Sequence, residues 1–134
     1  MNIFILVPFF SLIVSQIIKF IIEIIKYKKV CLERLFNGSG GMPSTHSAFV
    51  SSLTTLIYIY YGSNSLYFAI SFIFSLIIIY DSVGVRYESG KHAEIINIIT
   101  NNKNKLKEKL GHTLPEVICG IILGIMISLI YYFC

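Results

Sequence analysis

Four apolar runs alternate with polar segments along this chain of 134 residues. The runs cover about 3–25, 46–62, 66–80 and 115–133. A helix needs roughly 20 apolar residues to cross a bilayer, and about 17 is the lower limit. The pattern therefore predicts an all-α membrane bundle of about four transmembrane helices, formed by one integral-membrane domain that covers 1–134.

Two features modify this simple pattern. Pro8 lies inside the first run, where we expect it to kink the helix. Between the third and fourth runs, residues 81–114 are too long for a passive connection, and they contain the stretch "ESGKHAEIINIITNNKNKLKEKL" (88–110). Its spacing predicts an amphipathic helix, a polar break at "TNNKN" and then a basic helical turn. Either helical piece is suited to lie on an anionic inner leaflet, so we expect membrane lipids as partners.

The charged residues are segregated along the chain. The 11 Lys and Arg and the 7 Asp and Glu residues all fall in two blocks, Lys19–Arg34 and Asp81–Glu116. A bilayer imposes such segregation, because a charge at its centre costs about 2.5–3.5 kcal/mol or more. With four spans both blocks lie on one side, which the positive-inside rule makes cytoplasmic, with both termini outside.

Composition agrees with a membrane location. The chain is 55% hydrophobic and its mean hydropathy is +0.76, which is too apolar for an ordinary soluble domain. We expect an integral protein of a bacterial plasma membrane. The net charge of +4 then reflects loops on the cytoplasmic side, so we expect no nucleic-acid partner. The three cysteines form no Cys-x-x-Cys pair and are expected to have no role.

The first polar cluster is "GGMPSTHSA", residues 40–48. Pro43 stops any preceding helix, and Ser44 is a suitable N-cap for the second span. His46 then falls in the first helical turn, beside backbone N–H groups that bind anions readily. The alternative is a capped helix start whose histidine only lies at the interface.

The second polar cluster is "LGHTLPEVICG", residues 110–120. Thr113 and Glu116 fit a capping box with Pro115 in the first turn, so capping alone is one explanation for Glu116. His112 lies four residues before this carboxylate, within its reach. A carboxylate on one ring nitrogen fixes the tautomer and raises the basicity of the other nitrogen. That arrangement favours a histidine nucleophile.

Positive charges accompany these clusters. Lys19 lies inside an apolar run, where a lysine is a functional candidate unless it snorkels to the headgroups. Lys26 follows seven residues later on the same helix face. Asp81 and Arg86 end the third run at the same membrane level, either as part of a site or as a simple ion pair that stabilises the loop.

Together these residues suit a phosphate group. Two histidines, two cations and helix N-termini favour phosphoryl transfer through a phosphohistidine. Placement at headgroup depth indicates a lipid phosphate as substrate. We expect His46, His112, Lys19 and Arg86 to line one polar cavity at the cytoplasmic interface, and His92 to lie outside it.

Three stretches carry a resemblance to a known superfamily. "PSTHS" (43–47) resembles the second signature, Pro-Ser-Gly-His, of the type 2 phosphatidic acid phosphatase and vanadium haloperoxidase superfamily. "GHTLPEVICGIILG" (111–124) is similar to the end of its third signature, His-x-x-x-Asp followed by a glycine-containing helix. With "DSVGVR" between them, the whole chain resembles the divergent small-membrane-protein branch. The resemblance implies a metal-independent phosphatase, so no metal or cofactor is expected.

The resemblance also implies roles for individual residues. His112 would be the nucleophile and Glu116 its orienting carboxylate. His46 would protonate the leaving group, and Ser44 with the local backbone would bind phosphate. Lys19 would match the lysine of the first signature. Seven residues later that signature has an arginine, and Lys26 stands in this place.

The chain departs from the superfamily pattern at several positions. Thr45, a supporting residue, replaces the glycine of the second signature, and Glu116 replaces the aspartate of the third. Leu106 stands where the third signature has an arginine. We infer that Arg86, supported by Asp81, supplies this charge from the preceding segment. Four spans stand in place of the usual six-helix core.

Two further hypotheses remain open at this point. A non-catalytic protein that binds or translocates anionic lipid would use the same cationic pocket, and the missing arginine favours it. A metal-binding protein would use His46, His92 and His112, although no pair of them has a recognised ligand spacing. Gly120 and Gly124 form a GxxxG pattern, which is usually a helix-packing face and makes a homodimer a further expectation.

Overall fold

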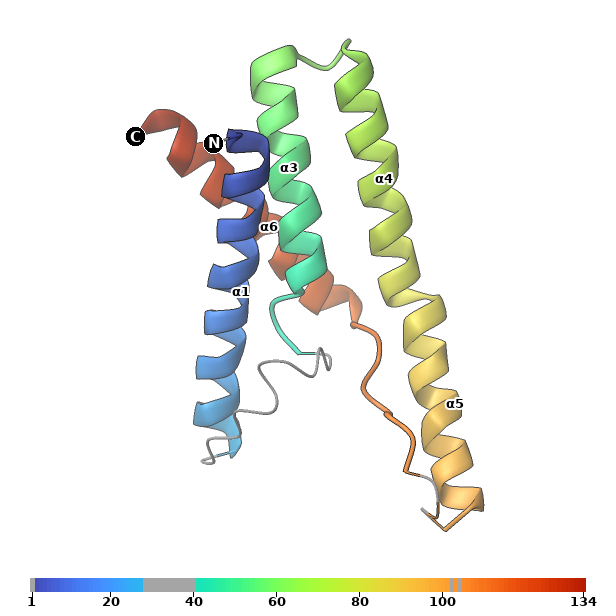
Figure 1. Cartoon of the computed structure of the whole chain (residues 1–134). Coiled ribbons are helices and arrows are strands. Elements are labelled where there is room, and N and C mark those ends of the chain that lie inside the picture. The colour runs from blue at the N-terminus through green and yellow to red at the C-terminus, as the bar shows by residue number, and fades with distance from the viewer. Residues whose placement is uncertain (1, 28–40, 102, 104) are drawn as a thin grey trace.

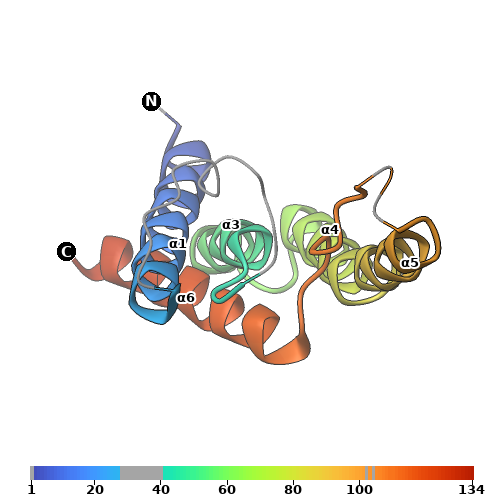
Figure 2. The ribbon, with the colours of Figure 1, turned by 90° about the horizontal axis from the view of Figure 1, so that it is seen from below.

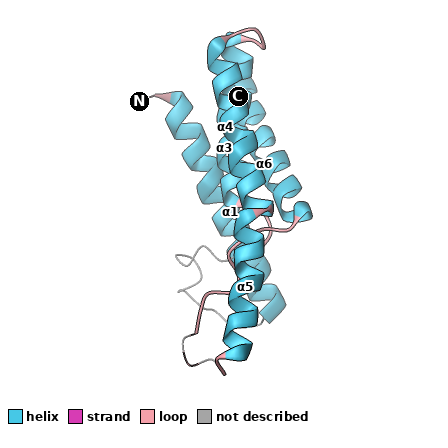
Figure 3. Cartoon of the chain, turned by 90° about the vertical axis from the view of Figure 1, so that its right-hand side faces the viewer, coloured by secondary structure: helices cyan, strands magenta, loops and turns pink. Residues whose placement is uncertain are grey.

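A computed structural model of the chain describes residues 2–27, 41–101, 103 and 105–134. The described residues form helices and no strand (Figure 3). The helices are α1 (Ile3–Tyr27), α3 (Thr45–Tyr61), α4 (Leu66–Val83), α5 (Val85–Ile99) and α6 (Leu114–Phe133) (Figure 1). The predicted all-α fold is confirmed. Residues 28–40, which contain Cys31 and Arg34, lie outside the described residues.

Helix α3 lies at the centre of the bundle. It packs against α1, α4 and α6, and the view from below shows α1 and α4 on opposite sides of it (Figure 2). Helix α6 crosses α1 and α3 obliquely (Figure 1). Both chain ends and the turn between α3 and α4 lie at one end of the bundle (Figure 1). The described parts of both charged blocks lie toward the other end, as the charge segregation predicts.

The bundle has small polar side chains inside and large apolar side chains outside. Phe10, Ile73 and Ile122, for example, are each more than half exposed. This arrangement suits a bilayer, because lipid tails solvate such side chains, whereas close helix contacts need small residues. Buried serines occur in α1, α3, α4 and α6: Ser11, Ser15, Ser47, Ser51, Ser52, Ser71, Ser75, Ser82 and Ser128.

Three helical stretches are long and apolar enough to cross a membrane, namely Ile3–Lys26, Leu66–Ile99 and Leu114–Phe133. The second predicted span, 46–62, corresponds to α3, whose 17 residues match the lower limit of about 17 for a spanning helix. Helix α1 continues through Pro8 as one helix, so this proline does not divide the first span. The fold is therefore a helical membrane bundle.

Close contact between α3 and α6 depends on two glycines. A Cβ at Gly120 would overlap the backbone carbonyl of Ser44, and a Cβ at Gly124 would overlap that of Ala48. One turn further, the hydroxyls of Ser52 and Ser128 share a hydrogen bond of 2.8 Å. The GxxxG pattern is thus a packing face within the chain. A homodimer stays a prediction and would have to use another surface.

The segment between the third and fourth spans differs in part from the prediction. Only Gly84 separates α4 from α5, which confirms the amphipathic helix and shows that it continues from α4 (Figure 1). The predicted basic helical turn is wrong, because residues 105–110 are not helical. The Asn97 amide explains this: Nδ2 donates to the Leu106 carbonyl at 2.9 Å, and Oδ1 accepts from the Leu106 N–H at 2.8 Å. These bonds hold the segment against α5 and take the place of helical hydrogen bonds.

Candidate functional site

The first residues of α3 and α6 lie side by side at the charged end of the bundle. The Ser44 N–H, just before α3, donates to the Glu116 carbonyl in the first turn of α6 at 2.9 Å. The end of α4 joins them, because the His112 N–H donates to the Ser82 carbonyl at 3.1 Å. Backbone hydrogen bonds therefore hold together three segments that are far apart in the sequence.

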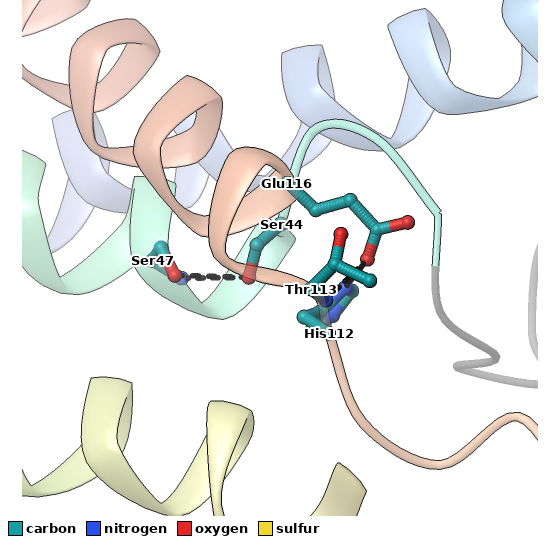
Figure 4. A network of polar contacts seen from close by, with 5 residues as sticks. All are labelled: Ser44, Ser47, His112, Thr113 and Glu116. Carbon is teal, nitrogen blue, oxygen red and sulfur yellow. Dashed lines mark hydrogen bonds and ion pairs between the residues drawn. The ribbon is translucent and has the colours of Figure 1, made fainter.

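One carboxylate oxygen of Glu116 serves two groups. Its Oε2 accepts from the Thr113 backbone N–H at 3.0 Å and lies 3.1 Å from His112 Nδ1 (Figure 4). An ionised carboxylate only accepts hydrogen bonds, so Nδ1 carries the proton and Nε2 keeps its lone pair. Glu116 therefore makes both contacts that the sequence suggested, one with the backbone of the first turn and one with His112.

His112 is well suited to be uncharged at neutral pH. Its side chain is buried, with 6% exposed. Burial is the largest effect and lowers the pKa of His112, while the hydrogen bond that His112 donates to Glu116 partly raises this pKa and the charge of Lys19 lowers it again. Because the net shift is downward from 6.5, the imidazole is mainly neutral at pH 7, and the neutral form is the nucleophilic one.

The start of α3 is capped but leaves its histidine open. The Ser44 hydroxyl accepts from the Ser47 N–H at 3.4 Å and from the Ser47 hydroxyl at 2.9 Å (Figure 4). Ser44 and Thr45 are buried, whereas His46 is exposed. No hydrogen bond links the His46 side chain to another described residue, although its charge and that of His112 act on each other. His46 is thus accessible to water and to a bound molecule.

The two predicted cations have different surroundings. Lys19 is buried, with 7% exposed, and the carboxylates whose charges act on it most are Glu116 and Glu23. Arg86 is half exposed, and its Nε donates to Asp81 Oδ2. The simple ion pair considered for Asp81 and Arg86 therefore exists. The Arg86 charge nevertheless acts on both histidines.

A cavity of about 640 Å³ adjoins these residues. His46, His112 and Arg86 are not in its wall, so this cavity is not the one that we expected them to line together with Lys19. The reason is that the His112 N–H is bound to the end of α4, and its imidazole is buried at the helix ends. The Glu116 carboxylate connects the two places, because it both lines the cavity and contacts His112. The wall includes Lys19, Lys26, Tyr87, Lys91, Glu108 and Glu116.

Other candidate residues lie elsewhere or were missed. His92 is exposed on α5 and outside the cavity, as predicted. Among the described residues, no group of three or more His, Cys, Asp and Glu side chains is placed to hold a metal ion. Sequence reasoning missed Glu23, which acts on Lys19, and Ser82, which fixes the His112 backbone. The one available signal for Ser82 was its position beside a charged residue at the end of an apolar run.

The arrangement provides what a phosphate group needs. The N-termini of α3 and α6 present backbone N–H groups and partial positive charge at one place. Lys19 adds a full positive charge from α1. His112 offers a lone pair, and the exposed His46 is able to exchange a proton with a bound molecule. These elements together suit nucleophilic attack on phosphorus.

Comparisons with known proteins cover the same residues. A family model described as "Divergent PAP2 family" matches residues 1–127. The chain is also similar to the uncharacterized membrane protein YuiD of Bacillus subtilis (strain 168), with 35% identity over 144 residues. That match covers 92% of this chain and 90% of YuiD. No solved structure shows a significant match.

Proposed function

The chain belongs to the divergent PAP2 family, and we propose that it hydrolyses a lipid phosphate or diphosphate through a phosphohistidine intermediate. One observation carries this proposal: the 3.1 Å contact between His112 Nδ1 and Glu116 Oε2, which leaves Nε2 available in a buried imidazole. Family membership supports a phosphatase-related role, and the membrane bundle supports a lipid substrate.

In the proposed reaction, His112 Nε2 attacks phosphorus, and an N–P bond forms as the P–O bond to the lipid breaks. His46 donates a proton to the departing oxygen. Water then attacks phosphorus while His46 takes up a proton, and the N–P bond breaks to release phosphate and restore His112. Glu116 stabilises the positive charge that develops on the imidazole during attack.

We further propose that fixed positive groups hold the phosphate oxygens. Lys19, Arg86 and the N–H groups around Ser44 and Thr45 would bind them, with Lys26 further along the cavity wall. Negative charge builds on these oxygens in the transition state, and donors already held by helices lower that barrier. The cavity of about 640 Å³, which Lys19 also lines, would take the polar part of the substrate.

The site is proposed to face the cytoplasm of a bacterial plasma membrane. The described parts of both charged blocks lie toward the end of the bundle where α3 and α6 begin (Figure 1). The positive-inside rule assigns that end to the cytoplasmic side. The substrate phosphate would therefore come from the inner leaflet.

A second function, binding or moving anionic lipid without turnover, is favoured by one observation. Arg86 is half exposed and paired with Asp81, and Leu106 stands where the superfamily has a further arginine. A cationic pocket without that arginine retains ground-state binding but loses stabilisation specific to the transition state. Such a protein would bind lipid phosphates and release none.

The test is phosphate release by purified protein in lipid vesicles, with a panel of lipid monophosphates and diphosphates and with or without chelator. We expect release that chelation does not reduce. His112→Ala should abolish it, whereas His92→Ala, an exposed histidine on α5, should leave it unchanged. Binding of lipid phosphate without release by the wild type would support the second function. Activity lost on chelation and restored by a divalent ion would support a metal-dependent reaction instead.

A further inference from the structure

Ser82 carries a buried hydroxyl that makes no hydrogen bond. Its side chain is 4% exposed, and among the described residues no other fully buried side-chain nitrogen or oxygen lacks a partner. Buried polar groups are almost always paired in folded proteins, because leaving one unpaired costs its desolvation without compensation. The hydroxyl therefore needs an explanation.

The other buried serines of α4 donate hydrogen bonds to the preceding turn of the helix, unlike Ser82. The Ser71 hydroxyl donates to the Phe68 carbonyl at 3.0 Å, and the Ser75 hydroxyl donates to the Ser71 carbonyl at 2.8 Å. Serines inside helices commonly form such bonds to the preceding turn. Ser82 lies on the same helix and makes no such bond. Its donor is thus available to a partner outside α4.

The position of Ser82 indicates what that partner is. Its carbonyl accepts the His112 N–H at 3.1 Å, so the residue lies directly beside the proposed nucleophile. The charge of the neighbouring Asp81 acts on His46. The last turn of α4 is therefore close to both histidines and to the first turns of α3 and α6. The group expected at this place carries oxygen acceptors and negative charge.

We propose that the Ser82 hydroxyl is a phosphate ligand that donates a hydrogen bond to one oxygen of the phosphoryl group at His112. The inference rests on the proposed function and deepens it. It adds α4 as a further element that contacts the substrate, and it gives the unpaired hydroxyl an acceptor. The chemical class of ligand is a tetrahedral oxyanion, and it becomes the trigonal-bipyramidal phosphorus during transfer.

The experiment compares Ser82→Ala with Ser75→Ala in the full-length protein, with inorganic phosphate and orthovanadate as probes. Ser82→Ala should weaken binding of both anions about 10- to 100-fold, the range for a lost hydrogen bond to a charged group. The unfolding temperature without anion should stay unchanged or rise, because an unpaired polar atom is removed. Ser75→Ala should show the opposite pattern, since the Ser75 hydroxyl shares a hydrogen bond of 2.8 Å with the Thr54 hydroxyl. It should unfold at a lower temperature and bind anions like the wild type.

Ser82→Cys keeps the size of the side chain and offers only a weak donor, so its affinity should fall between serine and alanine. Wild-type anion affinity in Ser82→Ala would overturn the inference, as would a loss of unfolding temperature like that of Ser75→Ala with unchanged binding. Failure of the wild type to bind either anion would refute the proposed function itself, and the ligand role of Ser82 with it.

Discussion

Helices α3 and α6 begin in a similar way but hold their histidines differently. Each has a hydroxyl residue at its N-cap, Ser44 for α3 and Thr113 for α6, and each has a histidine next to its first turn. His112 is buried and bonded to a carboxylate. His46 is exposed, and its side chain makes no hydrogen bond to the described residues. The first turn of α3 has no acidic residue, whereas that of α6 has Glu116.

This difference agrees with the two chemical roles proposed above for the histidines. A buried neutral histidine with a fixed tautomer offers a lone pair in a constant direction, which a nucleophile needs. An exposed histidine exchanges protons with water, which an acid or base needs. The bond from the Ser44 N–H to the Glu116 carbonyl keeps the two helix starts together. One carboxylate in one first turn is thus the main local distinction between them.

The largest effect is expected from forcing the two helix starts apart. In Gly120→Val, the new Cβ would overlap the Ser44 carbonyl, which is backbone and cannot rotate away. We expect a loss of about 3 kcal/mol or more, because the contact is overpacked, and with it loss of folded protein and of activity. Thermal unfolding of purified protein measures this. Ile122→Val, at an outward position of α6, is the control and should behave as wild type. A stable and active Gly120→Val would contradict the close contact.

The second-largest effect is expected from removing the negative charge of Glu116, which has no counterpart in the first turn of α3. In Glu116→Gln, the amide oxygen still accepts from the Thr113 N–H, so the cap and the unfolding temperature should be retained. Turnover should fall about 10²- to 10⁴-fold, because the neutral amide does not balance the positive charge that develops on the imidazole during attack. Glu88→Gln, on the exposed part of α5, should leave turnover unchanged. Wild-type turnover in Glu116→Gln would contradict the orienting role and would leave Glu116 only the role of a helix cap.

A smaller and more selective effect is expected from His46→Ala. A general acid matters most when the leaving group is a poor one, so hydrolysis of alkyl phosphates should slow by about 100-fold. Hydrolysis of an aryl phosphate with a good leaving group should slow much less. The ratio of kcat/KM for the two substrates measures the difference. Equal losses of kcat/KM on both substrates would show that His46 contributes to substrate binding and not to proton transfer.

The smallest effect concerns pH. Burial lowers the pKa of His112 in the folded protein, so the unfolded chain binds a proton there more readily. The contribution of His112 to stability is therefore fully present above about pH 6.5, its unfolded value, and is lost as the pH falls through the folded pKa. The acid limb of kcat/KM should lie below pH 6.5 for the same reason. Stability curves of wild type and His112→Ala that stay parallel down to pH 4 would contradict this.

Much of the fold was predictable because it depends on local pattern. Apolar runs bounded by charged blocks predict spanning helices, since a bilayer excludes charges and requires internal hydrogen bonding. The segment 105–110 was not predictable in this way. Its lysines and leucines suit a helix locally, but the Asn97 amide, nine residues before Leu106, binds both backbone groups of Leu106. Contacts between segments overrode the local preference.

In the candidate site, too, contacts between residues near in the sequence could be predicted, whereas contacts between separate segments could not. The contact between His112 and Glu116 joins residues four apart at the start of α6, so its spacing was visible in the sequence. The contact of His112 with Ser82 depends on how the end of α4 lies against the start of α6, which no spacing reveals. The separation of the cavity from the histidines also follows from helix crossing. Sequence therefore predicted the contact between His112 and Glu116, but it did not predict which surface the candidate residues share.

The most direct measurement asks which histidine carries the phosphoryl group. Wild-type protein is mixed with lipid phosphate, quenched rapidly at alkaline pH, digested and examined by mass spectrometry for phosphohistidine. We expect the modified peptide to contain His112, to be absent in His112→Ala and to persist in His92→Ala. Phosphorylation of His46, or steady phosphate release with no modified histidine at any time point, would contradict the assignment of His112 as the nucleophile.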